Sequence, residues 1–441
     1  MNLMTIDQNT PTDGRRVNQR QALVVILALS DLSRDPRVMR QILWLKKNYR
    51  VVAAGFAPPQ DDSVEFLSIG PTGVSGSQGA DLSVFLHLRN AIAKIPFARF
   101  LWRKLKRPLA IRRSALRSRD GVVREDHAAY YRSKLSAMCD CASLAGLSPD
   151  LILANDLDCL VLADLVFRGV RVVFDAHEYA PLEYASQDDF WVMQEQPARV
   201  WACRSLLPRV SGMSTVCSGI AQEFERNFEI PSGIKVITNA PLYESIAPRA
   251  TGPKTRIVHH GIGAPIRKIE LMAETVKILG PEYELYLILV EGDAKYIESL
   301  KSTYGPCGNI HFLQPVPMPD IAKFISRFDI GLFILEPDIF NYQWALPNKF
   351  FEFIQARLAI AVGPSPEMSR IVRDYGLGVV APDFLPASMA RALISLGPQD
   401  IDRFKANSDR CASLFCAEAN EREMLGIMER ALTGESVRSE A

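Results

Sequence analysis

The sequence predicts an α/β protein in which two Rossmann-like domains face a cleft. From residue 21 to about residue 395, short apolar runs alternate with segments of helical periodicity, which is the pattern of parallel sheets covered by helices. The alternation is interrupted once, near Pro241, Pro248 and Pro253, where the composition is that of an interdomain linker. A chain of 441 residues is also too long for one hydrophobic core.

Four segments are expected along the chain. Residues 1–20 are polar, contain Pro and Gly, and have the composition of a disordered tail. Residues 21–245 form the first domain and residues 250–395 the second, and residues 396–441 form a helical segment and tail. Ligands of such sheets bind at the carboxyl ends of the strands, so the cleft between the domains is the expected binding site.

The expected strands follow from the short apolar runs. In the first domain they lie within residues 22–29, 49–57, 149–156, 170–178, 210–218 and 235–241. In the second domain they lie within residues 255–262, 283–292, 309–316, 329–336, 358–362 and 377–381. Helical periodicity fills most of the intervals, as in residues 36–48, 127–146, 157–168, 190–206 and 219–228, and again in residues 266–279, 294–303, 319–326, 348–355 and 366–374.

The composition is that of an ordinary soluble protein. Hydrophobic residues make up 48% of the chain and charged residues 23%, and the net charge of +1 indicates no nucleic acid or other strongly charged partner for the whole molecule. The eight cysteines include no C-x-x-C pair, which argues against the usual zinc spacings and fits reduced thiols in a cytoplasm. The apolar run Ala22–Leu29 is too short to span a bilayer and has no cleavage site after it, so a first buried strand is expected there.

Two short motifs allow more than one interpretation. Gly261 and Gly263 form G-x-G after a strand, but Ile266 stands at the third glycine position of a dinucleotide fingerprint, so a tight strand-to-helix turn is the preferred interpretation. Asp156 and Asp158 form D-x-D, which some transferases use to hold a cation. Because this pair opens a helix directly after a strand, helix capping by Asn155 or Asp156 is preferred.

The segment "ALPNKFFEFIQARLAIAV" predicts a helix with one polar face. At 100° per residue, Asn348, Lys349, Glu352 and Gln355 fall within an arc of about 120°, and phenylalanines occupy the opposite side. The polar arc faces either water or a ligand that lies across the start of the helix.

Taken together, six stretches resemble the family 4-like (group 1) glycosyltransferases of the GT-B fold. They are "SRDPRVMRQILWLKKNYRVVAAG", "ANDLDCLVLADLV", "VVFDAHEYAP", "HHGIGAPIRKIELM", "DIGLFILE" and "LPNKFFEFIQARLAIAVGPSPEMSRIV". The resemblance covers about residues 21 to 432. It implies an enzyme that moves a sugar from a nucleotide-sugar to a glycan or lipid-linked acceptor, with retention of configuration and with neither a metal nor a cofactor. The first domain would face the acceptor and the second would bind the donor.

The resemblance also implies roles for residues of the second domain. Glu352 matches a carboxylate that accepts hydrogen bonds from the ribose hydroxyls, and Asn348 and Lys349 lie in the first helical turn, where phosphate is favoured. Gln355 is expected to be exposed. Arg267 and Lys268 follow the turn at Gly261 and would neutralise the diphosphate. Since two adjacent residues of a helix cannot both face one point, we favour Arg267.

In the first domain, His177 matches a histidine that the family directs at the donor sugar. Arg37 could contact phosphate or acceptor, or could equally cap a helix or pair locally. One position departs from the family pattern, because Trp344 stands where many relatives carry the first glutamate of E-x7-E. The nearest upstream acids are Glu336 and Asp338. A nucleotide-sugar epimerase of the same architecture and a non-catalytic binding member therefore remain as alternatives.

Residues 88–119 form an unusual insert of the first domain. They contain eleven Lys or Arg residues, no acidic residue, and interleaved apolar side chains such as Phe97, Phe100 and Trp102. This composition is typical of a segment that lies on an anionic membrane surface, where each basic residue contributes about 1 kcal/mol. A solvated helix pair is one alternative, and a nucleic-acid patch is another, although no supporting fold is evident for it. We favour membrane docking, which would place a cytoplasmic enzyme at the inner face of the cell membrane.

We therefore expect the purified protein to co-sediment with anionic liposomes at low salt, and less so at high salt or with neutral lipid. Replacing Arg103, Lys104, Lys106 and Arg107 by Gln should reduce this binding and leave ligand binding in the cleft intact. Sedimentation that is indifferent both to lipid charge and to these substitutions would mean that the insert is ordinary surface.

Overall fold

The computed structural model describes residues 21–70, 123–183 and 190–434. The tail predicted for residues 1–20 and the basic insert 88–119 lie outside the described residues. No helix in the described ranges is both long and apolar enough to cross a membrane. The eight cysteines, all within these ranges, are free thiols.

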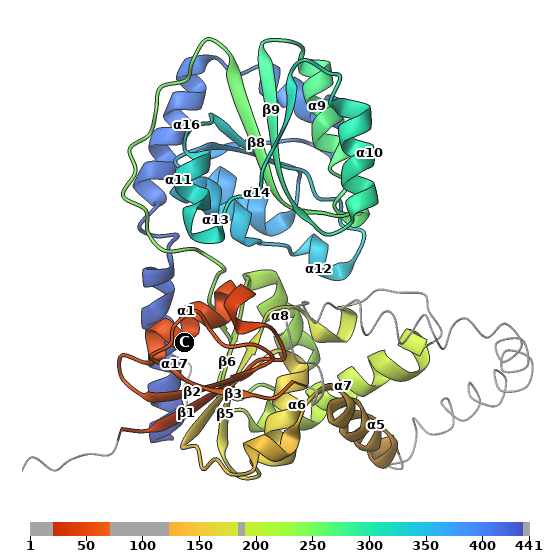
Figure 1. Ribbon diagram of the computed structural model, residues 1–441, viewed down its shortest axis with the longest axis vertical. Coiled ribbons are helices and arrows are strands. Elements are labelled where there is room, and N and C mark those ends of the chain that lie inside the picture. Colours follow the sequence, from red (N-terminus) through yellow and green to blue (C-terminus); the bar gives the residue numbers. More distant parts are fainter. Residues whose placement is uncertain (1–20, 71–122, 184–189, 435–441) are drawn as a thin grey trace, which may run out of the picture.

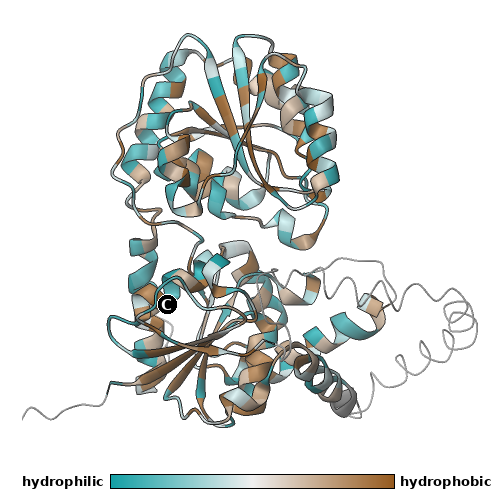
Figure 2. Cartoon of the chain, in the orientation of Figure 1, coloured by the Kyte–Doolittle hydropathy of each residue, from teal (hydrophilic) through white to brown (hydrophobic). Residues whose placement is uncertain are grey.

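The first half of the chain forms a parallel sheet of seven strands in the order β3-β2-β1-β4-β5-β6-β7 (Figure 1). The strands are β1 Leu23–Leu27, β2 Arg50–Gly55, β3 Glu65–Ser68, β4 Leu151–Asn155, β5 Arg171–Ala176, β6 Gly212–Thr215 and β7 Lys235–Val236. The central strands are apolar and fully buried because helices cover both faces of the sheet (Figure 2).

The helices of this half are α1 Pro36–Leu45, α5 Val123–Met138, α6 Asp156–Val166, α7 Gln196–Leu206 and α8 Ser218–Asn227, with short turns η1 Leu32–Arg34, η2 Cys141–Leu144, η3 Ala180–Leu182, η4 Trp191–Glu195 and η5 Leu207–Arg209. Helix α1 begins where the sequence provides both start signals. The side chain of Asp35 accepts a hydrogen bond from the backbone N–H of Val38, and Pro36 occupies the first turn. This start places Arg37 at the carboxyl edge of the sheet.

The second half forms a parallel sheet of six strands in the order β10-β9-β8-β11-β12-β13. The strands are β8 Thr255–Gly263, β9 Tyr283–Glu291, β10 Ile310–Leu313, β11 Ile330–Phe333, β12 Ala359–Val362 and β13 Gly378–Val380. The helices are α9 Glu270–Leu279, α10 Ala294–Tyr304, α11 Ile321–Ile325, α12 Phe340–Gln343, α13 Asn348–Gln355, α14 Pro366–Tyr375, α15 Pro386–Ile394 and α16 Pro398–Cys411, with short turns η6 Pro265–Arg267 and η7 Met318–Asp320. The predicted α/β class with two Rossmann-like sheets is confirmed.

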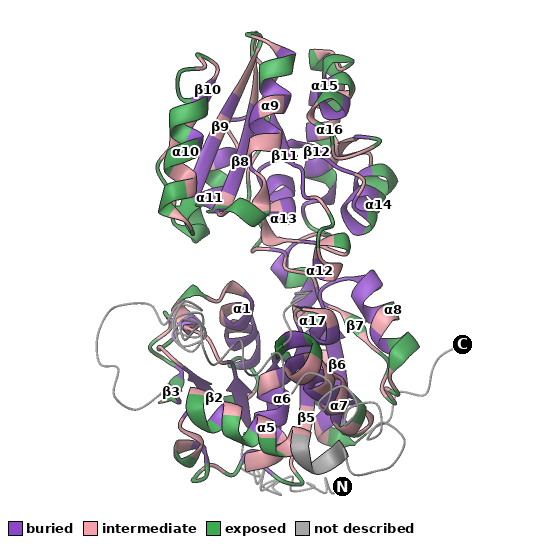
Figure 3. Ribbon diagram, turned by 90° about the vertical axis from the view of Figure 1, so that its right-hand side faces the viewer, coloured by how far each residue is buried: buried purple, intermediate pink, exposed green. Residues whose placement is uncertain are grey.

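The last helix, α17 Ala417–Thr433, returns to the first sheet. It packs against α1, β4, β5 and β6 (Figure 1), and its Met424, Ile427 and Met428 are buried there. The chain therefore passes between the two sheets twice, once before β8 and once between α16 and α17. Both connections run along the left side of the molecule in Figure 1, and Figure 3 shows the buried strands of the two sheets.

Both connections are held by the end of α13. The side-chain amide of Gln355 donates to the carbonyls of Ala412 (2.7 Å) and Phe415 (2.9 Å) and accepts from the backbone N–H of Glu244 (3.0 Å). Arg357 donates to the carbonyl of Glu244 at 2.7 Å. The expectation that Gln355 is exposed was wrong. It is fully buried, because its amide satisfies backbone groups of both connections, which helical periodicity cannot show.

Candidate functional site

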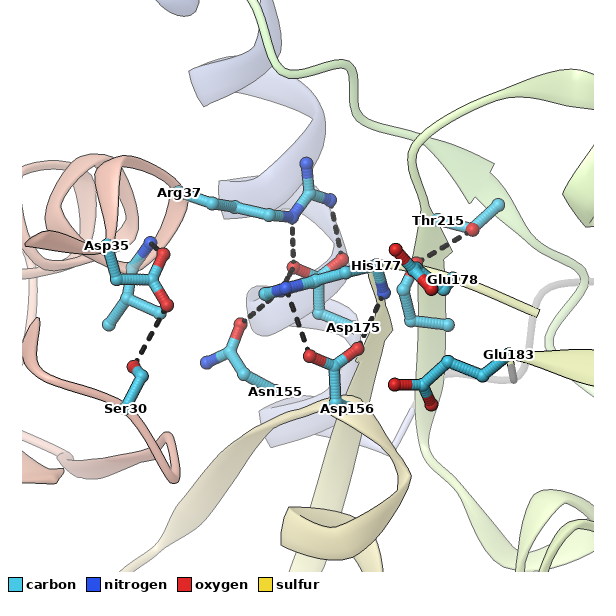
Figure 4. A network of polar contacts seen from close by, with 12 residues as sticks. Ser30, Asp35, Arg37, Asn155, Asp156, Asp175, His177, Glu178, Glu183 and Thr215 are labelled. Atoms are coloured by element: carbon cyan, nitrogen blue, oxygen red, sulfur yellow. Dashed lines mark hydrogen bonds and ion pairs between the residues drawn. The ribbon is translucent and has the colours of Figure 1, made fainter. Parts of the chain in front are cut away.

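At the carboxyl end of β5, the buried carboxylate of Asp175 is the centre of a polar network (Figure 4). It accepts hydrogen bonds at 2.6 Å from Nε and Nη2 of Arg37, from Nε2 of Gln41 and from Oγ of Ser214. Burial by itself would raise the pKa of Asp175, but the Arg37 guanidinium outweighs burial and holds this pKa well below its usual range. Asp175 is therefore a permanent buried anion.

Arg37 pairs within the protein, but its partner Asp175 is 138 residues away in the sequence and so is not local. Its remaining nitrogen, Nη1, donates to the carbonyl of Ile237 at 2.8 Å and to Oδ1 of Asn239 at 3.1 Å. The side chain is 6% exposed and its fork is occupied by Asp175. Arg37 therefore orients Asp175 and ties α1 to the segment after β7.

His177 lies next to this pair, one residue past β5. Its Nε2 is 3.3 Å from Oδ2 of Asp175 and 3.0 Å from Oδ1 of Asn155, and its Nδ1 is 3.2 Å from Oδ2 of Asp156. Burial lowers the pKa of His177, but the carboxylates of Asp156 and Asp175 reverse this effect and raise it to about 9. The imidazole is therefore a half-buried cation at neutral pH (Figure 4).

The preferred capping role of Asn155 or Asp156 was wrong. Neither side chain caps α6: Asn155 at the cap makes no side-chain hydrogen bond to the helix, and Asp156 has a positive φ of 64°. Instead, Oδ1 of Asp156 accepts from the backbone N–H of His177 at 3.0 Å. The two residues hold the imidazole from the adjacent strand end, a partnership between strands that local sequence does not reveal.

The end of β5 also contacts the second half directly. The backbone N–H of Tyr179 donates to Oδ1 of Asn341 at 2.9 Å, and Nδ2 of Asn341 donates to Oε2 of Glu178 at 3.0 Å. At the start of α8, the backbone N–H of Gly219 donates to Oε1 of Glu367 at 2.6 Å.

Trp344, which departs from the family pattern, belongs to this contact. A Cβ atom on Gly219 would lie 1.9 Å from the indole ring, so only glycine permits the approach. The thiol of Cys217 donates to the Trp344 carbonyl at 3.3 Å. Trp344 therefore packs against the first half.

In the second half, Gly261 and Lys349 approach each other closely. Gly261 has φ +133°, and a Cβ there would lie 2.7 Å from Nζ of Lys349. Gly261 lies inside β8, so the expected strand-to-helix turn does not begin there, and the glycine instead leaves room for the lysine. Gly263 is the last residue of β8 and precedes the 3-10 turn η6. Lys349 also lies over the Phe333 ring, with Nζ 4.4 Å from the centroid, and burial lowers its pKa to about 7.

Glu352 lies beside Lys349 on α13, 5% exposed. Its Oε2 is 3.3 Å from Nε2 of His260, a residue of β8 that sequence reasoning did not single out. Burial raises the pKa of Glu352 to about 7 and lowers that of His260 to about 3, so the imidazole is neutral. Asn348 is half-buried at the first residue of the same helix.

The side chains of the adjacent residues Arg267 and Lys268 have different neighbours. They do not share a regular helix, because Arg267 ends a 3-10 turn and Lys268 has φ 46°, so the helical argument used to choose between them was wrong. The Arg267 guanidinium lies 4.9 Å from the centroid of the Tyr342 ring. The Lys268 ammonium is paired with Asp338 (2.7 Å) and Glu336, which raise its pKa to about 12. Lys268 is therefore already neutralised by the protein.

The structure thus forms two groups of candidate residues. The first sheet presents His177 with Arg37 behind it, and the second sheet presents Gly261, Arg267, Lys349 and Glu352. No group of three or more His, Cys, Asp or Glu residues that could hold a metal ion occurs in the described ranges.

No protein-family model matches the chain, and no curated protein matches it in sequence. Solved structures do match. Sucrose-phosphate synthase from Thermosynechococcus elongatus is 12% identical with a TM-score of 0.63, over 94% of this chain and 100% of that one. HepE from Anabaena, in complex with UDP and glucose, is 14% identical with a TM-score of 0.59, over 92% and 99%.

TarM from S. aureus, in complex with fondaparinux, α-GlcNAc-glycerol and UDP, is 11% identical with a TM-score of 0.50, over 63% of this chain. The match spans 55% of the length of TarM. At 11 to 14% identity these likenesses show a shared fold. The two facing parallel sheets and these neighbours show that the chain has the GT-B fold of glycosyltransferases.

Proposed function

We propose that the protein is a glycosyltransferase that moves a sugar from a nucleotide-sugar to a glycan or lipid-linked acceptor, in polysaccharide or glycoconjugate biosynthesis. The observation that carries the proposal is the grouping of Glu352, Lys349 and Arg267 on the second sheet of a GT-B fold. HepE has been solved with UDP-glucose, which fits a nucleotide-sugar as the ligand class.

The second half, residues 250–395, would bind the donor. The two oxygens of Glu352 suit the two ribose hydroxyls, and His260 stands beside the carboxylate. Lys349 and Arg267, with Asn348 at the start of α13, would hold the diphosphate, because cations and free backbone N–H groups favour phosphate there. Lys268 forms ion pairs with Glu336 and Asp338 and would not bind the phosphate.

The first half, residues 21–245, would face the acceptor. His177 is charged and half-buried, and both of its ring nitrogens already face protein acceptors, so it would act on the donor sugar through its positive charge, which can stabilise negative charge. The reaction would retain configuration and use no metal. Fixed cations would stabilise the negative charge that develops on the departing nucleotide in the transition state. This stabilisation would lower the activation barrier. The basic insert, residues 88–119, would dock on the cytoplasmic surface of the membrane.

Two alternatives remain open. An epimerase of the same architecture would convert the donor without an acceptor. A non-catalytic member would bind nucleotide alone, and one observation favours it: Trp344 packs against Gly219 in place of a family carboxylate.

The proposal is tested by incubating the purified protein with UDP-, GDP- and ADP-sugars and measuring both free nucleotide and sugar products. Slow release of nucleotide from one donor, accelerated by a glycan acceptor, is expected. Epimer formation without transfer would identify the first alternative. Ligand-induced stabilisation with no turnover would identify the second.

Replacing Glu352 by Ala should weaken binding of the donor nucleoside by about 2 kcal/mol, because ribose hydroxyls would lose their acceptor in a buried site. In the wild type, the same affinity should fall as the pH drops below about 7, since the raised pKa of Glu352 then leaves it protonated. Titration calorimetry measures both effects. An affinity that neither the substitution nor the pH changes would rule out the ribose role.

Arg267→Ala and His177→Ala should differ in kinetics. Arg267→Ala should lower turnover about a hundredfold and also weaken nucleoside diphosphate binding, because the guanidinium would face the leaving group. His177→Ala should reduce transfer and leave the affinity for the bare nucleoside diphosphate nearly unchanged, because it would address the sugar. Equal losses of nucleotide affinity in the two variants would contradict this division of roles.

A further inference from the structure

Arg40 is a buried cation with one enclosed nitrogen that the described residues leave without a hydrogen-bond acceptor. It lies on α1, one turn after Arg37, and only 8% of its surface is exposed. Its Nη2 atom is enclosed and forms no hydrogen bond with the described residues. Arg37 on the same helix has its donors occupied by Asp175, Ile237 and Asn239.

An unpaired guanidinium in a buried position is costly, because it has lost its water without gaining an acceptor. Burial lowers the pKa of Arg40 to about 10, which still leaves the group charged at neutral pH. Asp175 does not supply a hydrogen-bond acceptor for Arg40, because its oxygens already accept from Arg37, Gln41 and Ser214. A negative partner from outside the protein would remove this cost.

The charged residues around Arg40 indicate where a negatively charged ligand would bind. Its electrostatic neighbours include Glu352 on α13, in the second half of the chain, in addition to residues of the first half. Glu352 in turn interacts with Lys349, and Lys349 with Arg267. One cation from each half, Arg40 and Lys349, therefore acts on the same carboxylate, and Arg267 adds a positive charge near Lys349; this arrangement favours an anionic ligand between the halves.

We propose that Arg40 binds a phosphate group of the nucleotide donor from the first half of the molecule, while Lys349 and Arg267 bind the diphosphate from the second. The inference rests on the proposed donor site at Glu352. If Glu352 holds the ribose hydroxyls, the phosphate attached to the same ribose is within reach of a cation beside that carboxylate. The planar guanidinium fork suits two phosphate oxygens. The nucleotide would then join the two halves.

The test uses the full chain and titration calorimetry with UDP, GDP and ADP, each compared with its nucleoside. Arg40→Gln should weaken binding of the preferred nucleoside diphosphate about tenfold or more and change binding of the nucleoside less than about twofold. Arg40→Lys should lie between, since it keeps the charge and loses the fork. Arg34→Gln is the matched control, because Arg34 is nearby and its side chain is 79% exposed; it should change neither affinity.

The outcomes separate this inference from the proposed function. If the wild type binds none of these nucleotides, the proposed function fails first. If the wild type binds one and Arg40→Gln binds it equally well, or loses nucleoside and nucleoside diphosphate in parallel, the phosphate role of Arg40 is overturned and the residue is structural. If circular dichroism shows that the Gln variant does not fold, the Lys variant is used for the test. A loss of affinity confined to the nucleoside diphosphate then supports the phosphate role of Arg40, and the absence of such a loss overturns it.

Discussion

The buried ion pair between Arg37 and Asp175 is the interaction on which the first half of the site depends. Asp175 accepts four hydrogen bonds at the carboxyl end of β5, which join it to α1 and β6, and Arg37 in turn donates to the segment after β7. Removing either partner of such a pair leaves an uncompensated charge in the interior. His177 takes its position and its charge from this arrangement, since Asp175 lies beside one ring nitrogen and Asp156 beside the other.

In the second half, helix α13 combines two tasks. Its first turns carry Lys349 and Glu352, which form the candidate nucleotide site, and Gln355 at its end binds both segments that connect the two sheets. A ligand that shifts α13 would therefore act on the connections directly. The phenylalanine face of this short helix is fully buried, and the helix packs against β11 and β12.

The two halves contact each other through hydrogen bonds and through aromatic packing. Asn341 and Glu367 bind backbone N–H groups of Tyr179 and Gly219, and Trp344 packs where Gly219 has no side chain. Hydrogen bonds to backbone N–H groups, the contact of Trp344 with Gly219, and the packing of Phe340 on Tyr179 with ring centroids 5.0 Å apart join the two halves.

The sequence by itself determined the α/β class, the alternation of strands and helices, and the helix that carries Glu352, because hydrophobic periodicity and helix start signals are local properties of the chain. Only the tertiary structure decided what the polar side chains face. Gln355 is buried by segments about 60 and 110 residues away, Asp156 holds His177 instead of capping its helix, and Lys268 is neutralised by Glu336 and Asp338. Arg40 and His260 gave no local signal at all. Partners of buried charges come from distant strands and helices, and their identity is set by packing that no single segment encodes.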